Sequence, residues 1–187
     1  FMALSVILSL PCAILGIGGG WITTVMVVIC AVMMILYETV LKQRGFVGNL
    51  TIAFLTAMIF MVGGSVTGHP WDNAIFAGMA FLVNVGREIS KDIEDMESDR
   101  DRKTLPMSIG PRRASYLASA FFILGPVLSL VPIALGEVTW AYYLVFLADG
   151  IFLYCGYMVP KDAHRAQKMA KIAMIIALVA FILDVIV

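Results

Sequence analysis

The sequence predicts an all-α fold: a polytopic membrane bundle of helices that forms a single transmembrane domain over residues 1–187. Of its 187 residues, 61% are hydrophobic and 14% are charged, and the mean hydropathy is +0.95. Soluble domains are nearer half apolar and a quarter charged, and a disordered chain needs low hydrophobicity with high net charge. Lys plus Arg and Asp plus Glu balance at 13 each, so no basic excess indicates a nucleic-acid partner.

Seven apolar stretches each approach the roughly 20 apolar residues that a helix needs to cross a bilayer core. Glycine clusters, prolines and one long charged segment separate them, as expected of turns and loops. No soluble linker or low-complexity segment interrupts the series, which favours one domain. In chain order, the predicted spans are 1–18, 22–40, 50–64, 73–90, 114–133, 140–158 and 169–187.

The basic residues test this count of spans. If the seven helices alternate in direction, the loops 41–49, 91–113 and 159–168 face the same side of the membrane. Together with the helix ends that flank them, these loops contain all 13 Lys and Arg residues, and the opposite loops contain none. Basic loops stay in the cytoplasm, so we expect a multi-pass integral membrane protein with these three loops on the cytoplasmic side.

The fourth predicted span runs into an acidic segment, residues 87–101, which holds seven of the 13 acidic residues. Continued as a helix at about 100° per residue, this segment places four carboxylates within one arc of about 60°. The apolar run before it, residues 74–86, is too short to span the bilayer alone, so this stripe begins at the membrane edge, where unpaired charge is expensive. The residues of the stripe are Glu88, Asp92, Asp95 and Asp99.

A stripe of carboxylates at the membrane edge needs a cation. Mg²⁺ binds one or two carboxylates together with water and phosphate oxygens, which makes the stripe a candidate Mg²⁺ site. The alternative is a solvated acidic loop that its interleaved Lys and Arg residues neutralise. The one-faced spacing and the position at the membrane edge favour the metal site.

Residues 92–99, Asp-Ile-Glu-Asp-Met-Glu-Ser-Asp, followed by Lys-Thr-Leu-Pro at 103–106, resemble the second aspartate-rich motif of the UbiA-type intramembrane prenyltransferases. That motif has the form Asp-x-x-x-Asp, which Asp95 and Asp99 meet. An acidic residue seven positions earlier recurs in the family, and Glu88 occupies that place. The resemblance implies a family fold of nine transmembrane helices, of which the seven predicted here are similar to the last seven.

A second similarity lies in residues 41–50, which resemble the family's loop after an earlier helix, whose lysine contacts diphosphate. Lys42 takes that place here. Two features depart from the family pattern. The family's first aspartate-rich motif has no counterpart in this sequence. Tyr37 and Lys42 are one residue further apart than the tyrosine and lysine of the family's Tyr-x-x-x-Lys.

The resemblance implies Mg²⁺-dependent transfer of a polyprenyl group from its diphosphate. In this interpretation Asp95 and Asp99 hold Mg²⁺, with help from Asp92 and Glu88. Lys42 stabilises the charge that develops on the departing diphosphate. Arg87 and Lys91 flank the stripe and are further diphosphate-binding candidates. The alternative is that they only extend to the membrane interface, as basic residues at helix ends often do.

The sequence of residues 87–95, followed by Lys-Thr-Leu-Pro at 103–106, is most similar to a group of archaeal family members. These members transfer a geranylgeranyl group to geranylgeranylglyceryl phosphate in ether-lipid synthesis. The expected partners are therefore a prenyl diphosphate donor, a lipid acceptor and membrane lipids, with no nucleic acid. An aromatic quinone precursor such as 4-hydroxybenzoate is the alternative acceptor. A cation-coupled transporter is the alternative of another class, but the sequence lacks the internal repeat that is common in transporters.

Three further polar residues lie outside this motif. Asp149, in the middle of the span 140–158, either lines a central cavity or makes a hydrogen bond to a neighbouring helix. Glu38 lies one turn before Lys42, which predicts an ion pair between them. His164 lies in a short charged loop and carries no functional prediction.

Overall fold

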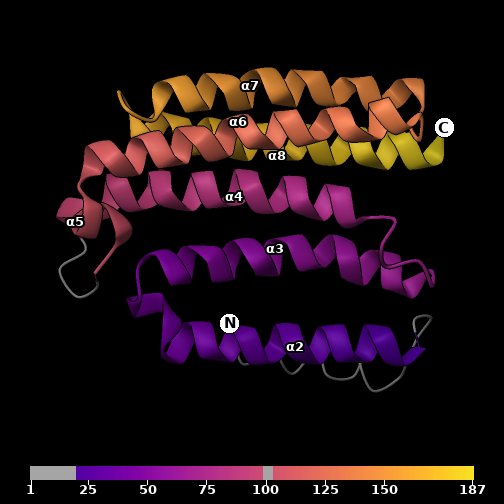
Figure 1. The fold of residues 1–187 in the computed structure, drawn as a ribbon, viewed down its shortest axis with the longest axis horizontal. Coiled ribbons are helices and arrows are strands. Elements are labelled where there is room, and N and C mark those ends of the chain that lie inside the picture. The colour runs from indigo at the N-terminus through magenta and orange to yellow at the C-terminus, as the bar shows by residue number, and fades with distance from the viewer. Residues whose placement is uncertain (1–19, 99–102) are drawn as a thin grey trace.

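The computed structural model describes residues 20–98 and 103–187 (Figure 1). All regular elements in these residues are helical, which confirms the predicted all-α class. In chain order they are α2 (Gly20–Thr39), the 3₁₀ helix η1 (Leu41–Gln43), α3 (Phe46–Val66), α4 (Ala74–Glu94), the 3₁₀ helix η2 (Asp95–Glu97), α5 (Leu105–Ile109), α6 (Pro111–Leu135), the 3₁₀ helix η3 (Trp140–Leu144), α7 (Val145–Met158) and α8 (Ala163–Ile186).

Five of the described helices are long and apolar enough to cross a membrane: α2, α3, α6, α8 and the continuous segment of η3 and α7. They coincide with five of the predicted spans. The predicted span 73–90 falls on α4, which lies alongside the long helices in Figure 1 but has a polar C-terminal third. The predicted span 1–18 lies outside the described residues.

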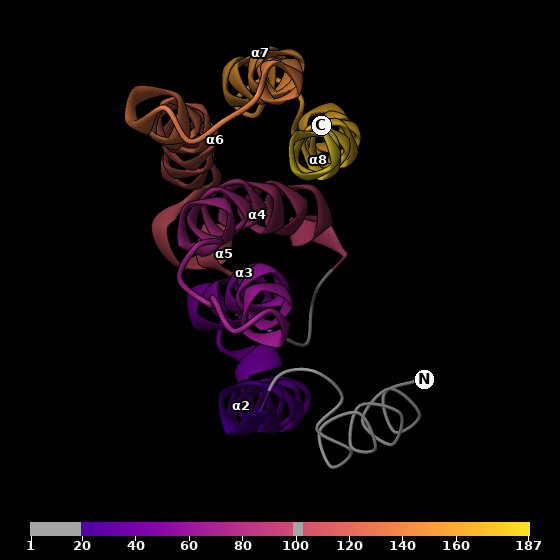
Figure 2. The ribbon, with the colours of Figure 1, turned by 90° about the vertical axis from the view of Figure 1, so that its right-hand side faces the viewer.

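Helix α4 lies at the centre of the arrangement. Seen along the bundle in Figure 2, α2 and α3 lie on one side of α4, and α6, α7 and α8 form a cluster on the other. Among the described elements, α4 contacts α3, α6 and α8, whereas α2 contacts chiefly α3. Residues carried by the end of α4 are therefore held from both sides.

Small residues allow these helices to approach closely, as is usual where membrane helices pack. A Cβ at Gly125 of α6 would lie 2.4 Å from the side chain of Val83 in α4, and a Cβ at Gly86 would lie 3.1 Å from the backbone oxygen of Ala118. Helix α8 presents a face of alanines to its neighbours at helical spacing. The buried alanines of α8 are Ala166, Ala170, Ala173, Ala177 and Ala180.

The two ends of the bundle differ in chemistry. The three Trp residues, Trp21, Trp71 and Trp140, all begin or connect helices at one end, and each is more than 70% exposed. Tryptophan gathers where a membrane meets water. The elements η1, α5 and the turn between α7 and α8 lie at the opposite end (Figure 1), and they belong to the three Lys- and Arg-rich loops.

Candidate active site

A small polar pocket, with a volume of about 20 Å³, lies at this second end of the bundle, where η1, the start of α3, the end of α4 and the start of α5 meet. Four of the residues that line it are predicted site residues: Lys42, Glu88, Lys91 and Asp92. The structure thus brings the predicted lysine of the early loop together with two members of the acidic stripe. The other lining residues are Tyr37, Gly45, Gly48, Asn49 and Thr104.

The carboxylate of Asp92 is buried and has a specific partner. The side-chain amide of Asn49 donates a hydrogen bond of 2.8 Å from Nδ2 to Asp92 Oδ2, and the two residues are 7% and 5% exposed. A hydrogen bond to a charged acceptor is stronger than one between neutral groups. This bond fixes the first turns of α3 to the last turn of α4. Asn49 carried no predicted role, although it lies within residues 41–50, the segment that resembles the family's lysine loop.

Glu88 is held by its neighbour in the chain. Arg87 Nη1 donates to Glu88 Oε1 at 2.5 Å and to Asn84 Oδ1 at 3.1 Å. Asn84 in turn donates from Nδ2 to Thr56 Oγ1 at 2.9 Å. Arg87 is not among the residues that line the polar pocket, because its guanidinium is directed to these partners. Its contact with diphosphate stays a prediction.

The loop that carries Lys42 is shaped by glycine. Lys42 Nζ lies 3.1 Å from Glu38 Oε1, which confirms the predicted ion pair. Gly45, at the start of α3, has φ +52° and ψ −117°, a conformation that L residues with a side chain rarely adopt. A Cβ at this position would lie 2.6 Å from the backbone oxygen of Lys103. The absence of a side chain at Gly45 therefore lets the Lys42 loop pack directly on residues 103–105.

The α-helix that carries the acidic stripe is shorter than predicted. We expected the fourth helix to continue through residue 101, but the α-helix ends at Glu94, and Asp95 begins the 3₁₀ helix η2. Ser98 closes this turn, with both its backbone N–H and its hydroxyl bonded to the backbone oxygen of Asp95. Asp95 is not among the residues that line the polar pocket. Asp99 lies outside the described residues, and the roles of both as metal ligands stay predictions.

Glu94, on the far side of the stripe, connects α4 to α8. Its Oε2 accepts a hydrogen bond of 3.0 Å from Gln167 Nε2, and its Oε1 pairs with His164 Nδ1. Burial raises the pKa of the Glu94 carboxyl, but the hydrogen bonds from His164 and Gln167 and the charges of His164 and Lys168 outweigh burial and lower the pKa. Sequence analysis predicted no role for His164, because no local pattern indicates a partner 70 residues away.

Asp149 both lines a cavity and makes a hydrogen bond to a neighbouring helix, the two alternatives that the sequence left open. It is 7% exposed, and it lines an otherwise largely apolar cavity of about 230 Å³ between α3, α4, α7 and α8. Its Oδ2 also accepts a hydrogen bond of 2.7 Å from Ser129 Oγ on α6. The hydroxyl of Tyr142 donates to the backbone oxygen of Ser129 at 2.9 Å, so this carboxyl belongs to a buried polar contact between helices.

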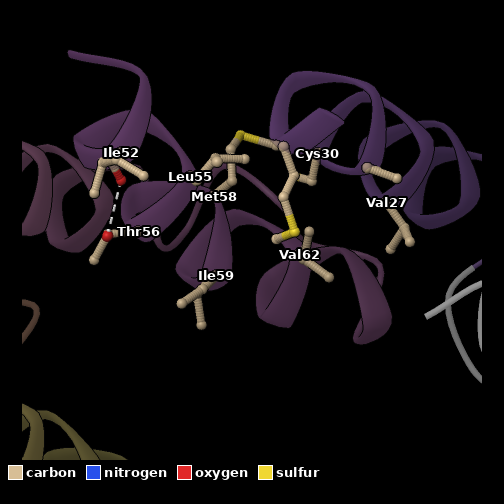
Figure 3. A pocket seen from close by; sticks show the side chains of 10 residues that line it. Val27, Cys30, Ile52, Leu55, Thr56, Met58, Ile59 and Val62 are labelled. Atoms are coloured by element: carbon tan, nitrogen blue, oxygen red, sulfur yellow. Dashed lines mark hydrogen bonds between the residues drawn. The ribbon is translucent and has the colours of Figure 1, made fainter. Parts of the chain in front are cut away.

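A larger apolar groove, of about 490 Å³, runs between α2 and α3. Figure 3 shows Val27 and Cys30 of α2 facing the side chains of α3 across it. The hydroxyl of Thr56 donates to the backbone oxygen of Ile52 at 3.0 Å, so the groove presents little polar chemistry. An apolar lining of this kind suits lipid or hydrocarbon chains.

The fold and the polar pocket define a multi-pass helical membrane protein with a charged site at one end of its bundle. Residues 1–180 match the UbiA prenyltransferase family. The chain belongs to this family, which confirms the relationship that the motif and the lysine loop indicated.

Curated relatives match this chain over most of its length. A digeranylgeranylglyceryl phosphate synthase of Methanosphaera stadtmanae is 37% identical over 185 residues, which are 95% of this chain and 68% of that protein. The enzyme of the same name from Thermococcus kodakarensis is 37% identical over 163 residues, 83% of this chain and 58% of that protein. The chain therefore spans between about half and two thirds of the length of such relatives.

A solved structure has the same fold. It comes from work described as "Structural and mechanistic insights into the biosynthesis of Digeranylgeranylglyceryl phosphate synthase in membranes", and it superposes with a TM-score of 0.84 at 29% identity. The match covers 97% of this chain and 68% of that one. Neither a transporter nor an enzyme with an aromatic acceptor is favoured by these comparisons.

Proposed function

We propose that the protein transfers a geranylgeranyl group from geranylgeranyl diphosphate to the free hydroxyl of geranylgeranylglyceryl phosphate. The observation that carries this proposal is the polar pocket, in which Lys42 and Lys91 meet Glu88 and Asp92 at one end of an apolar bundle. Membership of the family supports the reaction type, and the names of the relatives support the acceptor.

In the proposed reaction the bond between the allylic carbon and the diphosphate oxygen breaks, and the acceptor's hydroxyl oxygen forms a new bond to that carbon. The proton of the hydroxyl is released to the departing diphosphate. Lys42 and Lys91 stabilise the negative charge that grows on the diphosphate, an effect that is large where donors are fixed in advance. Asn49 keeps the carboxylate of Asp92 in place during this change.

The residues of the pocket suit Mg²⁺. In the described part of the chain, three or more metal-ligating side chains do not converge on one point, but Mg²⁺ is usually held by one or two carboxylates with phosphate oxygens and water. Glu88 and Asp92 supply the carboxylates at the pocket, and the motif adds Asp95 and Asp99. When bound there, Mg²⁺ supplies positive charge to the leaving diphosphate.

The apolar parts of the bundle provide for the rest of the substrates. The cavity of about 230 Å³ between α3, α4, α7 and α8 offers an apolar site for the isoprenoid chain of the donor, away from water. The distribution of Lys and Arg supports an orientation in which the polar pocket opens at the cytoplasmic surface, where soluble Mg²⁺ and diphosphate exchange.

The test uses the complete protein in membranes with geranylgeranyl diphosphate and Mg²⁺. One reaction contains geranylgeranylglyceryl phosphate, a second contains 4-hydroxybenzoate, and each has a control with EDTA. We expect product only in the first reaction and only with the metal. Product in the second alone would move the enzyme to quinone synthesis, and product in neither would contradict the proposed activity.

Two substitutions test the assigned roles in the same assay. Asp95→Asn should abolish turnover while the protein stays folded, and Lys42→Ala should raise the KM for the prenyl diphosphate. Asp72→Asn is the matched control, because Asp72 is an exposed acidic residue at the opposite end of the bundle. Near-normal Mg²⁺-dependent activity of Asp95→Asn would refute its role as a metal ligand.

A further inference from the structure

Thr104 has a buried hydroxyl for which the structure provides no partner. The residue is 2% exposed, it lines the polar pocket, and its Oγ1 makes no hydrogen bond. Its backbone oxygen accepts a bond from the Ser108 hydroxyl. A buried polar group without a partner is costly and uncommon in folded proteins.

The usual structural use of such a threonine does not apply here. Thr104 is the residue that precedes α5, and a threonine in this position normally accepts a bond from the second or third backbone N–H of the helix. No such bond is formed. The second position of α5 is Pro106, which has no N–H to donate.

The other described Ser and Thr residues that are buried behave differently. The hydroxyls of Thr51, Ser90 and Ser115 each donate to a backbone oxygen of their own helix, at 2.7 to 2.8 Å. Ser65 and Ser129 are also hydrogen-bonded. Thr104 is thus the exception among these buried Ser and Thr residues of the described part of the chain, and it is also the one of them that lines the polar pocket.

The position of Thr104 is fixed by the loop that carries Lys42. The ideal Cβ position at Gly45 lies 3.3 Å from the backbone carbon of Thr104 and 2.6 Å from the backbone oxygen of Lys103. Such a close contact holds the backbone of Thr104 beside the loop of Lys42. Thr104 therefore stays beside the pocket that Lys42 and Lys91 also line.

The donors of the pocket favour an anion as the missing partner. The two carboxylates that line it already accept hydrogen bonds, Asp92 from Asn49 and Glu88 from Arg87. Thr104 adds a hydroxyl donor to two lysine ammonium groups. Phosphate oxygens accept bonds from such donors strongly.

We propose that Thr104 binds the diphosphate directly, through a hydrogen bond from its Oγ–H to a diphosphate oxygen. This inference deepens the proposed function, because it assigns one more contact to the donor's leaving group. It makes Thr104 a binding residue whose hydroxyl has its partner only when the ligand is present.

The test measures binding of inorganic pyrophosphate, with Mg²⁺, to the complete protein in detergent, together with its thermal unfolding without ligand. Thr104→Val keeps the shape and removes the hydroxyl. Its affinity for pyrophosphate should fall about tenfold or more, as expected for a lost bond to a charged group. Its unfolding temperature without ligand should be unchanged or higher, because an unpaired polar group has been removed.

Two further variants separate binding from folding. Thr104→Ser restores a hydroxyl and should bind pyrophosphate within about threefold of the wild type. Thr51→Val removes a buried hydroxyl that bonds only within its own helix, so it should leave pyrophosphate binding unchanged.

Unaltered pyrophosphate affinity in Thr104→Val would overturn the proposal, and so would a wild type that binds no pyrophosphate. A lower unfolding temperature of unliganded Thr104→Val would also overturn it, since the hydroxyl would then hold the fold. Pyrophosphate binding needs no turnover. A protein that fails to prenylate its acceptor but needs Thr104 to bind pyrophosphate would therefore refute the proposed activity alone.

Discussion

Replacing Gly45 with alanine should destabilise the protein and weaken diphosphate binding at the same time. The backbone at Gly45, with φ +52° and ψ −117°, costs a residue with a side chain about 1 to 3 kcal/mol. The new Cβ would also lie 2.6 Å from the backbone oxygen of Lys103 and 3.3 Å from the backbone nitrogen of Leu105. Backbone atoms cannot move aside as the end of a flexible side chain can, and overpacking of this kind costs about 1 to 3 kcal/mol.

The two costs together predict a loss of about 2 to 6 kcal/mol in the free energy of unfolding. A movement that relieves the collision shifts either the loop that carries Lys42 or residues 103–105, which carry Thr104, so it separates residues that line the polar pocket. Denaturant unfolding in detergent measures the first effect, and pyrophosphate binding measures the second. Gly150→Ala is the matched control: Gly150 lies in α7, and nothing lies within 4 Å of its added Cβ. Its free energy of unfolding should change by about 1 kcal/mol or less.

Wild-type stability and wild-type pyrophosphate affinity in Gly45→Ala would refute this reasoning, because the loop of Lys42 would then not rest on residues 103–105. An equal loss in Gly150→Ala would also contradict it, since the effect would then come from removing any glycine.

Three further predictions concern the hydrogen bonds between helices. Asn49→Leu removes the donor to Asp92 and should lower the free energy of unfolding by about 1.5 to 3 kcal/mol; an unshifted denaturant midpoint at neutral pH would exclude this bond. Ser129→Ala leaves the buried carboxyl of Asp149 without its donor and should cost about 1 to 3 kcal/mol, seen as a lower unfolding temperature. The lowered pKa of Glu94 means that its carboxylate stabilises the folded state above its ordinary pKa of 4.5. The difference in unfolding temperature between wild type and Glu94→Gln should therefore shrink as the pH falls below that value, and a constant difference would contradict the assignment.

Much of the fold could be predicted because hydropathy acts locally. A helix in a bilayer must carry its own run of apolar residues, so five predicted spans coincide with described helices. The helical period also predicted correctly that Glu88 and Asp92 share a face. It failed at the end of α4, because periodicity does not indicate where a helix stops. Ser98 closes a 3₁₀ turn on Asp95, and the α-helical spacing ends before that turn.

The site was only partly predictable for a different reason. Lys42 and the acidic residues were identified by charge and by a family motif. Asn49 and Thr104 are small polar residues whose importance comes from partners or neighbours far away in the chain. Glu94 and His164 are likewise joined only by the packing of α8 on α4. Asn49 and Thr104 lie within segments that resemble the family, but those segments do not indicate what their side chains contact.

The two sides of the polar pocket, the carboxylates of α4 and the loop of Lys42, differ in how many packing contacts hold them. Its carboxylates belong to α4, which contacts helices on both sides. Lys42 follows α2, which among the described elements contacts chiefly α3 and has no buried residue. Segments with few buried contacts open first, well below global unfolding. On warming, amide hydrogens of α2 should therefore exchange with solvent before those of α4. A ligand that joins the lysine to the carboxylates protects the less stable side most, because binding only to the closed form shifts that local opening equilibrium. The peripheral helix is then the part of the molecule whose exchange rate reports most directly whether the site is occupied.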